Sequence, residues 1–147
     1  MNKTIVIDNK EYNAVYKGIT ARIYREYFQS DLFVDLNKIA DGFQDNLKEL
    51  VRTNGTTDDV DLSMMVITQG GSHFMEKIVW CSIYSGYALE KKQFQSFNDF
   101  IDNINDYASL MSAGIEVYTL MIYGNTTIEK PEKQEGEDED TPKKKEE

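Results

Sequence analysis

The feature that most constrains the fold is a long apolar stretch between Leu62 and Leu89. It contains few polar residues, and its apolar residues fall on nearly every side of a helix rather than on one stripe. A helix of this kind has no polar face to turn to water, so other elements must surround it. The pair Gly70-Gly71 lies near the middle, and we therefore expect either two helical segments or one bent helix. The stretch predicts a central helix around which the rest of the domain packs.

The N-terminal segment is expected to form a β-hairpin. Thr4–Ile7 and Glu11–Tyr16 are rich in β-branched and aromatic residues, and Asp8, Asn9 and Lys10 between them favour a turn. A two-stranded hairpin is only marginally stable by itself in water. We therefore expect it to pack against the helices that follow.

Two helices are expected between the hairpin and residue 54. The first has Thr20 as its N-cap. Its apolar face contains Ile23, Tyr24, Tyr27 and Phe28. Ser30 or Asp31 can cap the second helix, which should stop at Asn54-Gly55. The apolar residues of the second helix recur at the spacing of a core-facing stripe, and they are Leu32, Leu36, Ile39, Phe43, Leu47, Leu50 and Val51.

Two more helices are expected after the polar break Glu90–Gln95. Ser96 can cap the first of them, and Asp99 three residues later resembles the acidic partner of a capping box. One side of this helix contains Phe97, Phe100, Ile101 and Ile104. The last helix spans about Tyr107–Tyr123 and ends at Gly124 or Asn125. Its apolar side should contain Tyr107, Leu110, Met111, Ile115, Tyr118 and Ile122.

The composition changes completely after Ile128. Residues 129–147 include nine acidic and five basic residues and no apolar residue except two prolines. Such a segment cannot bury a face and is expected to be disordered. We therefore expect one globular domain over residues 1–128 and a charged tail over 129–147. The predicted fold class is mostly α (α+β), with a small N-terminal β-hairpin packed on a bundle of about five helices.

The charge of the chain argues against a nucleic-acid partner. The formal net charge is −10, and only −4 of it lies in residues 129–147, so the rest of the chain also repels a phosphate backbone. Cys81 is the single cysteine of the sequence, which excludes an intrachain disulfide and suits a reducing cytoplasm. No apolar run approaches the ~18 residues of a membrane span. We expect a cytoplasmic protein that contacts no membrane.

No pattern of residues points to catalysis. His73 and Cys81 are the best candidate pair, but eight residues along one helix separate them by ~12 Å, whereas a nucleophilic dyad needs ~3 Å. One histidine and one cysteine cannot supply a structural zinc site. The acidic run Asp58, Asp59 and Asp61 lacks the ligand order of a calcium loop and is better explained by helix capping and solubility. We expect a non-enzymatic protein without a cofactor or a metal site.

Apolar side chains supply the candidate binding residues. Trp80 is either a core anchor or a hot spot on a binding surface. The stripe on the helix after Ser96 either closes the domain's own core or forms, with nearby methionines, an adaptable groove for another protein's helix. The second interpretation gives as partner-binding residues Trp80, Phe97, Phe100, Ile101, Ile104, Met111 and Met121.

The order of the elements resembles that of a known protein family. The elements are a hairpin segment "VIDNKEYNAVYKGITARIYREY", a capped helix "SDLFVDLNKIADGF", a hydrophobic helix ending "IVWCSIYSGYAL", an "SFNDFID" helix, a last amphipathic helix and a charged tail. With Trp80 and the Ser96-Phe97-x-x-Phe100 start as anchors, residues 4–123 resemble the tail assembly chaperones of long-tailed phages that infect Gram-positive bacteria. The family has no invariant catalytic signature.

The resemblance implies a role in tail morphogenesis. Members of the family bind the long, largely helical tape-measure protein, keep it soluble and help to bring tail-tube subunits to it. The implied partners are the tape-measure protein and, through an extended form of the chaperone, the tail-tube protein, and a homo-oligomer is compatible with this role. The implied location is the host cytoplasm, with the protein absent from the mature virion. The alternative is a structural virion component, such as a minor tail or head–tail connector protein.

The tail contains a candidate frameshift position. In this family a −1 ribosomal frameshift near the end of the shorter product commonly makes the extended form. Slippage needs an A-rich run of codons, which Lys143, Lys144 and Lys145 could supply. The alternative is a solvated lysine cluster that balances the acidic residues of the tail. The codons of these three lysines distinguish the two interpretations.

Overall fold

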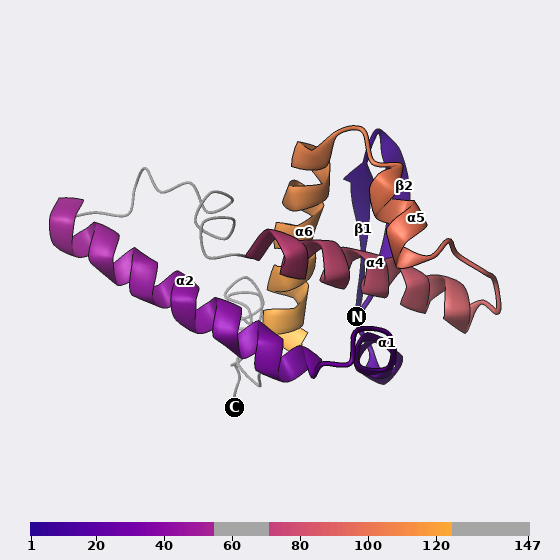
Figure 1. Ribbon diagram of the computed structural model, residues 1–147, viewed down its shortest axis with the longest axis horizontal. Coiled ribbons are helices and arrows are strands. Elements are labelled where there is room, and N and C mark those ends of the chain that lie inside the picture. The colour runs from indigo at the N-terminus through magenta and orange to yellow at the C-terminus, as the bar shows by residue number, and fades with distance from the viewer. Residues whose placement is uncertain (55–70, 125–147) are drawn as a thin grey trace, which may run out of the picture.

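The computed structural model describes residues 1–54 and 71–124. In this part of the chain it contains one antiparallel hairpin and five helices, so the predicted mostly α fold with an N-terminal hairpin is confirmed (Figure 1). The elements are β1 (Asn2–Ile7), β2 (Lys10–Val15), α1 (Gly18–Phe28), α2 (Leu32–Asn54), α4 (Gly71–Leu89), α5 (Phe97–Asp102) and α6 (Tyr107–Gly124).

Several predictions lie outside the described residues. They are the start of the long apolar stretch at Leu62, the acidic run Asp58, Asp59 and Asp61, and the tail 129–147 with Lys143, Lys144 and Lys145. Among the helices that the structure does describe, none is long and apolar enough to cross a membrane.

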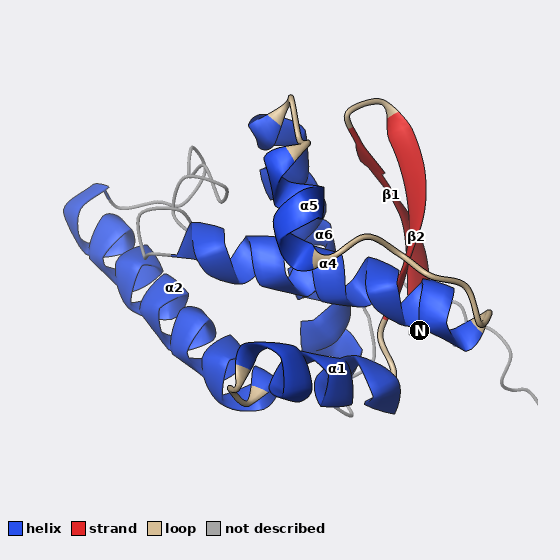
Figure 2. Cartoon of the chain, turned by 45° about the vertical axis from the view of Figure 1, so that its right-hand side comes forward, coloured by secondary structure: helices blue, strands red, loops and turns tan. Residues whose placement is uncertain are grey.

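Helix α4 lies at the centre of the domain. It is contacted by β2, α1, α5 and α6, and it crosses α6 in both views (Figures 1 and 2). Buried side chains occur all around it, and Ile78, Val79, Trp80 and Ile83 have no exposed surface. The prediction of a central helix is therefore confirmed for Gly71–Leu89.

The hairpin turns at Asp8 and Asn9, both with positive φ angles of 54° and 63°. Two consecutive residues of this kind are typical of a type I′ turn, whose twist matches that of the two strands. Lys10 pairs with Ile7 and is the first residue of β2, so its prediction as a turn residue is wrong. The face with Ile5 and Ile7 is buried against the helices.

The start of α1 differs from the prediction. Lys17, and not Thr20, is the N-cap, and Thr20 is buried in the first turn. The Thr20 hydroxyl donates a hydrogen bond to the carbonyl of Val15 at 3.0 Å and accepts one from the Lys17 N–H at 3.1 Å. Thr20 therefore joins the end of β2 to α1, because the Val15 carbonyl at the end of the hairpin needs a donor once it is buried.

Helix α2 begins as predicted and then leaves the body of the domain. The Asp31 carboxylate accepts hydrogen bonds from the N–H groups of Phe33 and Val34, which confirms it as the cap. Leu32 and Leu36 are buried, whereas the far end of α2 points away from the other elements (Figures 1 and 2). The remainder of the predicted stripe falls largely on side chains outside the described part of the chain, namely Phe43, Leu47, Leu50 and Val51.

Helix α5 is shorter than predicted. The Ser96 hydroxyl accepts a hydrogen bond from the Asp99 N–H at 3.2 Å, so the predicted cap is confirmed. The helix ends at Asp102, and Ile104 lies beyond it, which makes its placement on the helical stripe wrong. The physical reason is the Asp8 carboxylate, which accepts hydrogen bonds from the backbone N–H groups of Asn105 at 2.9 Å and Asp106 at 2.6 Å and holds the chain in a loop.

Helix α6 has the predicted bounds, and its buried face is broader than predicted. Its buried side chains include Leu110, Ala113, Val117, Leu120 and Met121. Of the predicted face, Leu110 and Met111 are buried, Ile115, Tyr118 and Ile122 are half-buried and pack against the core, and Tyr107 is 43% exposed, so its placement on the buried side is wrong. The small residues on this helix decide the orientation, since they let it approach α4 closely at Gly114.

The contact between α6 and α4 leaves no room for a side chain at Gly114. A Cβ atom there would lie 2.8 Å from both Cβ and Sδ of Met75. We therefore expect Gly114→Ala to lower the free energy of unfolding by about 1–3 kcal/mol, as overpacked cores do, in a chemical denaturation experiment. Gly18→Ala is the matched control, because a Cβ at Gly18 meets nothing within 4 Å. Equal stability of the two variants would contradict the close packing of α6 on α4.

Candidate functional site

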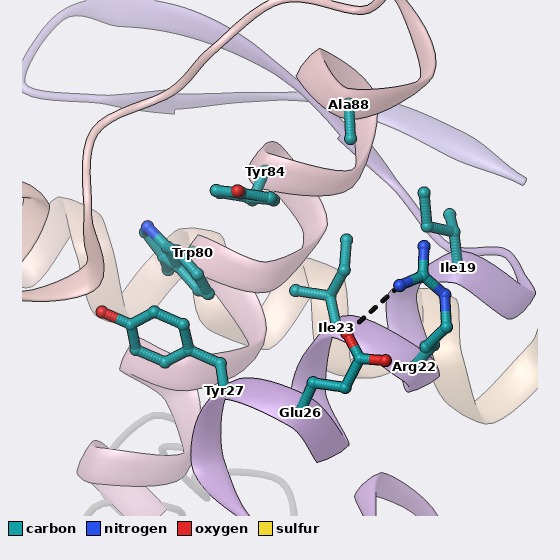
Figure 3. A pocket seen from close by; sticks show the side chains of 8 residues that line it. All are labelled: Ile19, Arg22, Ile23, Glu26, Tyr27, Trp80, Tyr84 and Ala88. Atoms are coloured by element: carbon teal, nitrogen blue, oxygen red, sulfur yellow. Dashed lines mark hydrogen bonds and ion pairs between the residues drawn. The ribbon is translucent and has the colours of Figure 1, made fainter.

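A groove opens between α1 and the second half of α4 (Figure 3). Its volume is about 370 Å³, which is within the range of pockets that take ligand side chains or small molecules. Residues spaced by three or four on each helix line it, and they are Ile19, Arg22, Ile23, Glu26, Tyr27, Trp80, Tyr84 and Ala88.

Aromatic rings form the back wall of the groove. The Trp80 ring has no exposed surface, and it lies 4.6 Å from the ring of Tyr27 and 4.8 Å from that of Tyr84, centroid to centroid. Its indole N–H donates a hydrogen bond to the carbonyl of Gln95 at 3.0 Å, which fixes the ring. Tyr27 is 47% exposed and forms the rim. The wall is therefore rigid and apolar, and it can be reached from solvent through Tyr27.

The α1 side of the rim also has charged groups. Arg22 Nη1 lies 3.2 Å from Glu26 Oε1 across one turn of α1 (Figure 3). Both side chains are more than half exposed, so this ion pair adds little stability. The lining has no nucleophile or titratable pair placed for proton transfer, and its chemistry is that of a binding site.

The candidate catalytic pair is not assembled. Cys81 is buried and its thiol donates to the carbonyl of Thr20 at 3.4 Å, and burial raises the pKa of the thiol well above its usual range. The His73 ring is exposed on the same helix, with Nδ1 3.3 Å from Glu76 Oε1. Within residues 1–54 and 71–124 there is also no cluster of three His, Cys, Asp or Glu side chains that could hold a metal ion.

The seven predicted partner-binding residues do not form one surface. Trp80, Phe100, Met111 and Met121 are buried in the core, and the half-buried Phe97, Ile101 and Ile104 pack against it. Trp80 contacts Phe97 at 5.9 Å, whereas Phe100 belongs to a second cluster with Tyr12 and Phe94. These positions match the interpretation in which the α5 stripe closes the domain's own core. Partner binding by the seven residues stays a prediction.

Sequence reasoning missed most of the groove. The spacing of Trp80, Tyr84 and Ala88 places them in one row on α4, and Ile19, Ile23 and Tyr27 form a similar row on α1. Each row is visible in the sequence as a repeat of three to four residues. The sequence does not show that the two rows lie side by side, because the segments are more than fifty positions apart in the chain.

A second cluster of polar groups joins α1, α2 and α4 beside the groove. Asp35 Oδ2 accepts hydrogen bonds from the Tyr24 hydroxyl at 2.7 Å and from the Ser30 hydroxyl at 2.8 Å, and Lys77 Nζ lies 3.9 Å away. The Lys77 ammonium also lies over the rings of Tyr24 and Phe28, at 5.3 and 5.4 Å from their centroids. The Asp35 carboxylate, the two hydroxyl groups and the Lys77 ammonium all have partners within the cluster. We therefore interpret the cluster as the contact that holds α2 against α1 and α4.

The environment of Asp35 has opposing effects on its pKa. Burial raises the pKa, but the hydrogen bonds from Tyr24 and Ser30 and the charges of Lys77 and Lys38 outweigh it, so the net shift is downward. The pKa of Tyr24 is raised, first by burial and then by its hydrogen bond to Asp35. The folded protein therefore favours the ionised carboxylate and the neutral phenol.

We expect Asp35→Asn to destabilise the protein by about 1–3 kcal/mol at neutral pH, because charge-assisted hydrogen bonds are weakened. A carboxylate whose pKa is lowered on folding stabilises the protein above its ordinary value of 3.8 and loses that effect as the pH falls through the lowered value. The stability difference between the two proteins should therefore shrink below about pH 4 in denaturation experiments. Asp102→Asn, an exposed position at the end of α5, is the control. A difference that stays constant with pH would contradict the role of the charge.

Comparison of the chain with protein-family models, with curated proteins and with solved structures finds no match. The function must therefore be argued from the groove and from the resemblance in sequence pattern.

Proposed function

We propose that this chain is a phage tail assembly chaperone that binds and solubilises the tape-measure protein and helps to recruit tail-tube subunits. The single observation that carries the proposal is the groove between α1 and α4, with its aromatic wall of Tyr27, Trp80 and Tyr84. Tryptophan and tyrosine are the residues that most often dominate binding energy at protein interfaces. The resemblance of residues 4–123 to this family supports the same conclusion.

The shape of the groove suits an amphipathic helix as a client. A long helical protein exposes apolar stripes that aggregate unless another protein covers them. The groove lies between two rows of side chains on neighbouring helices, and a ridge of a third helix packs into such a space. The lining is apolar with two charged residues at the rim, which favours reversible cover over permanent burial.

The proposal includes a cellular setting. The chaperone acts in the host cytoplasm before the tail polymerises, and it is absent from the mature virion. An extended form made by frameshifting near Lys143, Lys144 and Lys145 contacts the tail-tube protein. The net charge of −10 keeps complexes with covered clients apart by mutual repulsion.

The proposal is tested by co-expression with a helical fragment of a phage tape-measure protein. We expect the fragment to stay in the soluble fraction and to co-purify with the chain. A fragment that precipitates equally with and without the chain would overturn the proposed function. Detection of the chain in purified virions by mass spectrometry would instead favour a structural component of the particle.

The groove is tested by Tyr27→Ser. Tyr27 is 47% exposed and provides the aromatic rim, so we expect its removal to weaken affinity for the fragment about tenfold or more, measured by titration of the purified fragment. Phe33→Ser is the matched control, because Phe33 is 45% exposed on α2 and does not line the groove. If both variants lowered the affinity equally, the fragment would bind at a surface other than the groove.

A further inference from the structure

The two walls of the groove are more basic than the rest of the chain. Residues 17–28 and 80–95, which contain both walls, carry five basic and two acidic residues, whereas the whole chain carries 16 basic and 26 acidic residues. Two of the five are paired, Arg22 with Glu26 at 3.2 Å and Lys92 with Glu90 at 3.3 Å. Lys17 and Lys91 are exposed and have no ion pair within the described part of the chain. The lining of the groove is neutral, with one basic and one acidic side chain, and the exposed Lys17 and Lys91 lie in the chain just beyond the lining residues Ile19 and Ala88.

The fold holds these two lysines at the same end of the groove. Ile19 near the start of α1 and Ala88 near the end of α4 both line this end (Figure 3). Lys17 is the N-cap of α1, directly before the helix that carries Ile19. Lys91 has a left-handed φ angle of 59° and its N–H bonds to the carbonyl of Ala88 at 3.0 Å. The chain thus turns back at the end of α4 and keeps Lys91 beside Ala88.

The dimensions of the walls define the length of an occupant. Ile19, Ile23 and Tyr27 are spaced by four along α1, and Ala88, Tyr84 and Trp80 are spaced by four along α4. Eight residues of helix span about 12 Å, which is slightly more than two turns. A docked helix would therefore contact both walls through apolar residues at positions i, i+4 and i+7.

We propose that the groove selects an amphipathic helix with acidic residues beside its apolar stripe, and that Lys17 and Lys91 recognise those acidic residues. This inference rests on the proposed function, because it names the chemistry of the client helix. The apolar rows give affinity and the lysines give orientation and selectivity, as charges at an interface rim do. The remainder of the chain opposes this selection, since a net charge of −10 attracts basic peptides at long range. A preference for an acidic helix can thus arise only from a local contact.

Two labelled peptides provide the test. Both carry the same apolar residues at i, i+4 and i+7, and they differ only in having glutamate or lysine at the positions that flank the stripe. Binding to the full chain is measured by fluorescence anisotropy at low and high salt. We expect the glutamate peptide to bind about fivefold more tightly at low salt, and the difference to shrink at high salt because the two lysines are exposed. Equal affinity, tighter binding of the lysine peptide or no binding of either peptide would overturn the inference.

Variants locate the effect on the groove. Lys17→Glu with Lys91→Glu should remove or reverse the preference, whereas the hairpin pair Lys3→Glu with Lys10→Glu makes the same change in net charge and should retain it. Tyr27→Ser should lower the affinity for both peptides without changing which of the two binds more tightly. A preference that the hairpin pair removes equally would show a long-range effect and overturn the local contact. If the lysine peptide binds more tightly while the tape-measure fragment is still kept soluble, the inference fails and the proposed function stands.

Discussion

Helix α4 is apolar on nearly every side, and this one property shapes the arrangement of the other elements. Such a helix must be covered from several directions, because every apolar side chain left in water forgoes the free energy that its burial would contribute. The hairpin, α1, α5 and α6 each supply part of the cover. The close approaches at Gly86 and Gly114, where an added Cβ would lie within 3.1 and 2.8 Å of its neighbours, show how tightly β2 and α6 are applied. On the α1 side the cover leaves a groove.

The incomplete cover of α4 produces the groove. Helix α1 has only 11 residues and reaches along part of the second half of α4. Its aromatic residues differ in burial: Tyr24 is fully buried and bonds to Asp35 of α2, Phe28 packs against Trp80 and Phe97, and Tyr27 is 47% exposed. Asp35 holds α2 in that position through Tyr24, Ser30 and Lys77. The groove therefore depends on packing that fixes α1 from both sides.

Local signals in the sequence were sufficient for the elements and insufficient for their contacts. The hairpin turn at Asp8 and Asn9 and the caps Asp31 and Ser96 follow from residues next to each other in the chain, and all three are confirmed. Thr20 was wrongly predicted as a cap because its hydroxyl is used by Val15, a contact between two different elements. In this case a contact between two elements overrides the local preference of the residue for a helix cap.

The same limit explains α6 and the binding residues. Apolar side chains occur on several sides of α6, so the period alone does not identify the buried face. The close approach of Gly114 to Met75 of α4 fixes it. The aromatic stripe of α5 was equally ambiguous between core and interface. Phe100 is buried among Tyr12 and Phe94 because the hairpin lies directly beside α5, which no pattern within α5 could indicate.

The proposed chaperone role requires a protein that remains soluble when no client is bound, and the lining of the groove is compatible with this requirement. Trp80 is the largest side chain of the wall, yet it has no exposed area, and the rings of Tyr27 and Tyr84 lie against it on the groove side. Both covering side chains end in a hydroxyl group, so the empty groove presents polar atoms along with ring surface. The charged margin with Arg22 and Glu26 adds hydration at the rim. In the proposed function, a client helix that displaced water here would gain apolar contact, and the polar atoms would break up the continuous apolar patch that promotes aggregation of an empty protein.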